Sequence, residues 1–183
     1  MDPIEELVRG FQDLVAQVPE LVQPLVVMLA GTIPFIEGEV AAMVGVVGGM
    51  HPILAGLAAA VGNFVCVFVI VLLTSRARTA VMDRRAARVT VGAGLSEPEE
   101  ALATEKPESK GRAKFKRWIV RFGVPGASIL GPLAIPTQFT SAILVAGGTP
   151  RGWVLLWQAI AIVIWTTVAT VSVWAALTFV VGV

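Results

Sequence analysis

Two stretches of sequence decide the fold: LVVMLAGTIPFIEGEVAAMVGVVGG at residues 25–49 and LGPLAIPTQFTSAILVAGG at residues 130–148. Each is apolar, and each is interrupted by an Ile-Pro pair. Proline disfavours helix at the residue before it and starts a new helix well. A spanning helix needs about 20 apolar residues, whereas pieces of about 10–14 suit half-membrane segments. Each stretch therefore predicts two short helices meeting at a helix break, at Pro34 and at Pro136.

The same order of features follows each break. A short apolar helix, a Gly-Gly pair, a proline and a long apolar run come after Ile33-Pro34, and the same series comes after Ile135-Pro136. The long runs cover residues 52–74 and 152–181 and are long enough to span a bilayer. The spacing from Ile-Pro to Gly-Gly differs by three residues between the two. The ordered series predicts an internal repeat.

The composition is that of a membrane protein. Hydrophobic residues make up 56% of the chain and charged residues 15%, whereas soluble domains carry about 25% charged residues. The charges are also clustered. Between residues 21 and 74 only Glu37, Glu39 and His51 could be charged near neutral pH, and from residue 122 onward only Arg151 could.

The charges also predict an orientation. Residues 75–121 hold twelve of the fourteen Lys and Arg residues, whereas residues 1–40 hold seven acids and one base. Loops rich in Lys and Arg stay in the cytoplasm. We therefore expect a multi-pass protein of the cell membrane whose central loop is cytoplasmic.

Two topologies fit the repeat. Either both broken segments cross the membrane and the halves run parallel, or both are re-entrant hairpins and the halves are inverted. Arg151 follows the second Gly-Gly pair, and a re-entrant hairpin would place it inside with the other bases. We therefore expect an all-α membrane protein made of an inverted repeat, each half a re-entrant broken-helix hairpin followed by a transmembrane helix. Inverted repeats with discontinuous helices are a recurring plan of secondary transporters.

Four segments are expected along the chain. Residues 1–20 form an amphipathic helix, 21–75 the first membrane repeat, 76–121 a basic cytoplasmic linker, and 122–183 the second repeat. A short basic amphipathic helix at the end of the linker suits the lipid surface. Its interfacial residues are Lys114, Lys116, Arg117, Trp118 and Arg121. Attraction to the negatively charged lipid surface explains these basic side chains, so no nucleic-acid partner is expected.

Several stretches resemble the small multidrug export protein family over roughly residues 25–180. They are GTIPFIEGEVAAMVG, AAAVGNFVCVFV around Asn63, KRWIVRFG and LGPLAIPTQFTSAILVAGG. The arrangement is also similar to a reduced DedA-type membrane protein, a group implicated in lipid-carrier translocation. It departs from that group because no arginine follows the proline-containing segment at 132–136. The first resemblance implies export of small compounds.

Glu37 and Glu39 are the sharpest candidates for function. A carboxylate at bilayer depth costs about 2.5–3.5 kcal/mol on insertion scales, and such residues are functional candidates by default. Away from water, such a carboxyl could exchange protons near neutral pH. The alternative is structural, because acids are favoured in the first turns of a helix. Positions two residues apart face different ways on a helix, so we expect at most one of the two to line a cavity.

Neutral polar residues occupy the equivalent place in the second half. Thr137 and Gln138 follow the break at Pro136, where they could bind an ion or satisfy backbone groups that the proline frees. Asn63 lies inside the first long run, where interhelical hydrogen bonding is the alternative to binding. A metal cluster is not expected with one His and one Cys, and no cofactor or enzyme pattern stands out.

Three functions fit the sequence. The first is a proton- or ion-coupled exporter of small amphipathic or cationic compounds, centred on Glu37, Glu39 and Gln138. The second is a lipid or lipid-carrier translocase of DedA-like type, and the third is a non-transporting membrane scaffold. Membrane lipids, protons and a small-molecule substrate are the expected partners. A homo-oligomer is also expected, because so few complete spans can hardly shield broken backbone from lipid.

Overall fold

A computed structural model describes residues 17–92 and 123–181, and these residues are helical with no strand. The first half comprises α2 (Gln23–Gly31), α3 (Glu37–Val47) and α4 (Pro52–Gly92). The second half comprises α6 (Val124–Leu130), the 3₁₀ turn η2 (Gly131–Leu133), α7 (Thr137–Ala146), α8 (Arg151–Ala176) and η3 (Leu177–Val181). The all-α prediction is confirmed for this part of the chain. The predicted amphipathic helix at 112–121 and nearly all of the one at 1–20 lie outside it.

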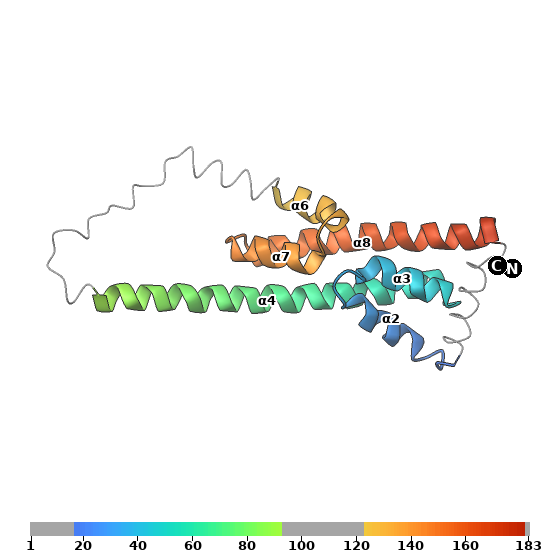
Figure 1. The fold of residues 1–183 in the computed structure, drawn as a ribbon, viewed down its shortest axis with the longest axis horizontal. Helices are drawn as coiled ribbons and strands as arrows, with labels where there is room; N and C mark the ends of the chain where they lie inside the picture. Colours follow the sequence, from blue (N-terminus) through green and yellow to red (C-terminus); the bar gives the residue numbers. More distant parts are fainter. Residues whose placement is uncertain (1–16, 93–122, 182–183) are drawn as a thin grey trace.

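Two long antiparallel helices, α4 and α8, form the spine of the molecule (Figure 1). The start of α4 at His51 lies beside Trp174 of α8, and the far part of α4 at Arg78 lies beside Gly148, just before α8. α2 runs toward the middle of the spine and α3 returns (Figure 1). α6 likewise runs from the opposite end to the middle, and α7 returns. The tips of the two hairpins therefore meet halfway along the spine.

The two hairpins turn in different ways at their tips. α2 ends at Gly31 and α3 begins at Glu37, so Pro34 lies between them in a short non-helical link. In the second half Pro136 has extended backbone angles, φ −51° and ψ 144°, and α7 begins at the next residue. Two residues therefore lie between Pro34 and α3, whereas none lies between Pro136 and α7. α3 is also one residue longer than α7, at 11 against 10 residues, which accounts for the spacing difference between the halves.

In the described part of the chain, two helices are long and apolar enough to cross a membrane. They are Pro52–Arg84 within α4 and the stretch Arg151–Val180 that begins with α8. The assignment of these two helices as candidate spans rests on their length and composition alone, which are compatible with a membrane location. α4 itself has 41 residues, about 62 Å at 1.5 Å per residue.

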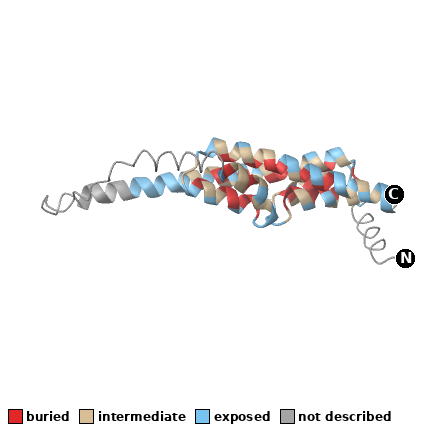
Figure 2. Cartoon of the chain, turned by 90° about the horizontal axis from the view of Figure 1, so that it is seen from above, coloured by how far each residue is buried: buried red, intermediate tan, exposed pale blue. Residues whose placement is uncertain are grey.

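α4 continues beyond the boundary expected at residue 75. The apolar run ends there, but the helix persists to Gly92 as one element. Arginine and alanine recur in this extension, and both are strong helix formers in water. The first part of the expected linker is therefore a continuation of the long helix, which is exposed beyond its apolar part (Figure 2). Arg76, Arg78 and Arg84 are exposed along it.

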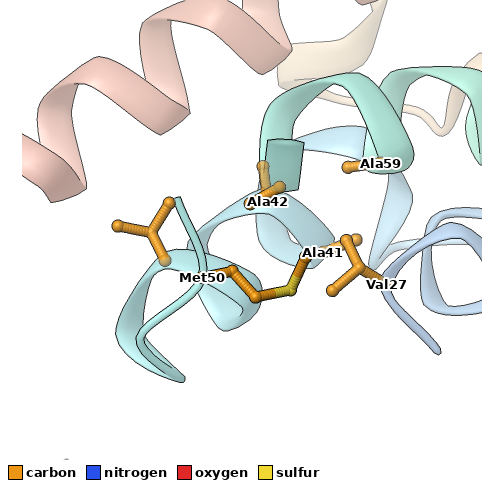
Figure 3. Close-up of a cluster of buried hydrophobic side chains, with 7 residues drawn as sticks. Val27, Ala41, Ala42, Met50 and Ala59 are labelled. Carbon is orange, nitrogen blue, oxygen red and sulfur yellow. The ribbon is translucent and has the colours of Figure 1, made fainter. Parts of the chain in front are cut away.

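Buried side chains gather in the middle of the spine (Figure 2) and form one apolar cluster in each half. The first cluster is made mainly of small side chains, and Figure 3 shows Val27, Ala41, Ala42, Met50 and Ala59 within it. Glycine allows this close packing, because a Cβ at Gly62 would overlap the Met28 carbonyl of α2. The second cluster is aliphatic and larger in side-chain size, with Val67, Val71, Val124, Val145, Val154 and Ile162.

Candidate functional site

The two hairpin tips are joined by a carboxylate. The Thr137 backbone N–H donates a hydrogen bond to Glu37 Oε1 at 2.6 Å, and the Thr137 hydroxyl donates to the same oxygen at 2.6 Å. The two residues are one hundred positions apart in the chain. Glu37 is 6% exposed and Thr137 is 1% exposed, so water competes little with this contact. We call this contact the tip junction.

Two amide side chains extend the tip junction. Asn63 Oδ1, from α4, accepts a hydrogen bond from Gln138 Nε2 at 3.2 Å and lies 3.1 Å from the Thr137 hydroxyl. A threonine hydroxyl has one proton, so it donates to either Glu37 or Asn63 at any moment. Four of the five residues singled out as candidates in the sequence thus share one buried network drawn from α3, α4 and α7.

The structural role of Glu37 is to cap a helix in the other half. The first N–H groups of a helix have no partner within it. α7 begins after Pro136, which has no side-chain cap, and Thr137 is its first residue. Glu37 supplies the missing acceptor, and its negative charge is also favoured at the positive end of α7. The same geometry makes the contact sensitive to the protonation of one carboxyl.

The backbone at this tip is strained. Phe35 has φ 71° and Glu37 has φ 52°, a left-handed conformation that non-glycine residues rarely adopt. Each such residue costs about 1–3 kcal/mol and persists only where surrounding contacts hold it. Strain of this kind concentrates at functional sites. Sequence reasoning did not find it, because neither residue is of a type that signals a left-handed turn.

A cavity of about 330 Å³ opens beside the tip junction. Both Glu37 and Glu39 line it, with the segment Pro132–Pro136 opposite and the aromatic side chains of Phe35 and Trp165 in its wall. The expectation that at most one carboxylate lines a cavity is therefore wrong. Regular helical spacing turns the two side chains to different faces, but the cavity lies where α3 meets the segment Pro132–Pro136 and reaches both residues.

The cavity has features that suit a small cation. Glu39 Oε1 is buried and has no hydrogen-bond partner among the described residues. The Trp165 indole is fixed by its N–H, which donates to the Ile129 carbonyl at the end of α6 at 2.7 Å. Carboxylates and aromatic faces together attract ammonium groups. Trp165 is thus a fixed part of the cavity wall.

Outside the tip junction and the cavity, one further hydroxyl near the start of α7 has a structural role, and the interfacial candidates lie outside the described residues. The Ser141 hydroxyl donates to the Gln138 carbonyl at 2.8 Å, which fits a structural role in the first turns of α7. Among the described residues no group of three or more His, Cys, Asp or Glu side chains could hold a metal ion. Lys114, Lys116, Arg117, Trp118 and Arg121 lie outside those residues.

Comparison with models of known protein families, with curated proteins and with solved structures finds no match to this chain.

The tip junction predicts a measurable coupling between Glu37 and Thr137. Glu37→Leu and Thr137→Val each remove part of the contact. In a double-mutant cycle their free energies of unfolding should fail to add by about 1–3 kcal/mol, because hydrogen bonds to a buried charge are strong. The measurement is chemical unfolding in detergent followed by circular dichroism. The control cycle pairs Glu39→Leu with Thr137→Val and should be additive; equal coupling in both cycles would contradict the assignment.

Proposed function

We propose that this chain is a membrane transport protein in which the tip junction links the movement of a proton or another cation to the export of small amphipathic cations. The observation that carries the proposal is the Glu37–Thr137 contact between two helix breaks, beside a cavity with two carboxylates. The resemblance to the small multidrug export protein family supports the same class of function.

The proposal places the two hairpins in the membrane from opposite faces, as an inverted repeat of re-entrant segments. The antiparallel course of α4 and α8 supports it, because it puts the start of α8 beside the Arg78 guanidinium at Gly148. Arg151 then shares a membrane face with the basic extension of α4, and positively charged segments stay on the cytoplasmic side. Secondary transporters use the same plan, with binding sites where broken helices meet.

Labelling at residue 151 tests this topology. In a Cys66→Ala background, Arg151→Cys in whole cells should resist a membrane-impermeant thiol reagent and react once the membrane is permeabilised, because the residue would be cytoplasmic. His51→Cys is the matched control at the other end of the spine and should react in intact cells. Reaction of Arg151→Cys in intact cells would rule out the inverted arrangement.

Protonation of the Glu37 carboxyl would control whether the two hairpin tips stay together. When Glu37 is ionised, Oε1 accepts both donors of Thr137 and faces the positive end of α7. When Glu37 takes up a proton, the charge-assisted part of these bonds is lost, and charge-assisted bonds are roughly twice as strong as neutral ones. The tips would then separate more readily, and the proton would leave when they close again. Glu39, whose Oε1 has no hydrogen-bond partner among the described residues, is the group available to a cationic solute.

Transport by proteoliposomes tests the mechanism. Glu37→Gln should abolish ethidium uptake driven by a pH gradient, because the amide keeps an oxygen for Thr137 but cannot exchange a proton. Glu20→Gln, at an exposed carboxylate before α2, should leave uptake unchanged. If both Glu37→Gln and Glu39→Gln transport ethidium like the wild type, the mechanism is wrong, and the absence of any wild-type uptake would favour a scaffold.

A lipid translocase is the second candidate, and a lateral groove favours it. Between α4 and α8 lies a largely apolar cavity of about 490 Å³ that extends from His51 and Gly56 to Thr170 and Trp174. In the proposed membrane placement this groove would face the acyl chains. A scrambling assay with a fluorescent phospholipid separates the two candidates: scrambling that persists in Glu37→Gln while ethidium is not moved would favour the lipid function.

A homo-oligomer is part of the proposal. Phe35 and Leu133, at the two tips, are 76% and 68% exposed, and the non-helical links beside them carry backbone groups that lipid cannot satisfy. A second copy would cover these links. Chemical crosslinking in native membranes should recover dimers or larger species, whereas recovery of monomer alone would contradict the proposal.

A further inference from the structure

Gln158 of α8 is a buried amide with no partner. The side chain is completely buried, and neither its Nε2 nor its Oε1 has a hydrogen-bond partner among the described residues. Its neighbours one turn away on the same face, Val154 and Ile162, belong to the aliphatic cluster of the second half. The hydroxyl of Ser128 is in the same state on α6, which packs against α8.

Such groups are costly in a closed structure. Each unsatisfied buried donor or acceptor destabilises by about 1–3 kcal/mol, and native proteins keep few of them. The fold does not need an amide at this place. Counted from the prolines that precede the two long apolar runs, Pro52 and Pro150, the position of Gln158 corresponds to Ala60 in the first half. The first half thus has a small apolar side chain at the equivalent position, so the repeat itself does not account for the amide.

Gln158 lies on α8 midway between Arg151 and Trp165. Gln158 lies seven residues after Arg151 and seven before Trp165, so it is about 10 Å along the helix from each. Arg151 lies at the end of the spine where Arg78 of α4 is found, which we call the basic end. Trp165 lies in the wall of the cavity that Glu37 also lines. Val154 and Ile162, on either side of it along α8, belong to the second cluster. In this structure Gln158 is thus completely buried, at a position on α8 between Arg151 and Trp165.

We infer that Gln158 and Ser128 line an access path between the basic end and the tip junction in a second conformation, where they bind water or a neutral hydrogen-bonding group of the solute. An amide offers two donors and an acceptor, and a hydroxyl offers one donor and an acceptor, so both suit water, alcohols and amides. That the path carries a solute rests on the proposed transport function. That it passes Gln158 and Ser128 rests on their unpartnered polar atoms.

The hairpin α6–α7 is the element that would move to open this path. It consists of short helices of 7 and 10 residues. Its tip is held by a small set of side-chain hydrogen bonds: Thr137 to Glu37, Gln138 to Asn63, and Trp165 to the Ile129 carbonyl. Its other end joins α8 through Gly147 and Gly148, the latter with φ 98°. Small residues at the end of an element are common hinges.

Thiol accessibility tests the inference without any transported substrate. In a Cys66→Ala background, Gln158→Cys in proteoliposomes should react with a small charged methanethiosulfonate at least ten times faster than Ala59→Cys. Both positions are completely buried, but Ala59 lies in the first cluster, away from the path. Arg151→Cys is the exposed reference. Equal, slow reaction of Gln158→Cys and Ala59→Cys at both acid and neutral pH would overturn the inference.

A second variant separates function from packing. Gln158→Leu replaces an unpaired amide with an apolar side chain of similar size, so its Tm should rise, while ethidium uptake should fall at least tenfold. Asn63→Leu removes an amide that has a partner and should lower Tm. A raised Tm with unchanged uptake would make Gln158 a packing defect and overturn the inference. If the wild type moves no ethidium, the proposed function fails, and thiol accessibility alone decides the inference.

Discussion

One buried carboxylate holds the two halves of this protein in register. Glu37 reaches from the strained start of α3 to the first N–H of α7, and both hairpins end where this contact is made. Without an acceptor at that point, α7 would begin after a proline with its first donors buried and unpaired. The contact is therefore a condition for closing the middle of the spine. A strained backbone at Phe35 and Glu37 is tolerated because it delivers the carboxylate to that position.

The outline of the fold follows from the sequence, and its central contact does not. Hydrophobic runs and prolines predicted an all-helical chain with two long apolar helices, and the described residues have both. The free-energy cost of burying a carboxylate made Glu37 a candidate. The correspondence between the helix breaks at Pro34 and Pro136 made Thr137 a candidate. That these two side chains bond to each other depends on how separate hairpins pack, which no local pattern encodes.

Two details show where sequence reasoning fails physically. Helical spacing implied that Glu37 and Glu39 face different ways, but both line one cavity, which opens where α3 meets the segment Pro132–Pro136. The loss of apolar residues after Thr74 implied the end of a helix. Hydrophobicity reports the surroundings of a helix, whereas persistence of the helix depends on backbone propensity, and the arginines and alanines that follow keep it high.

The uninterrupted course of α4 has a mechanical consequence. From Thr74 to Gly92 the helix extends about 27 Å past its apolar part, and no proline occurs within α4 after its first residue. The helix therefore has no break where its apolar part ends. A tilt of the apolar part would displace the distal end by a distance that grows with the length of the extension, whereas a flexible joint would absorb it.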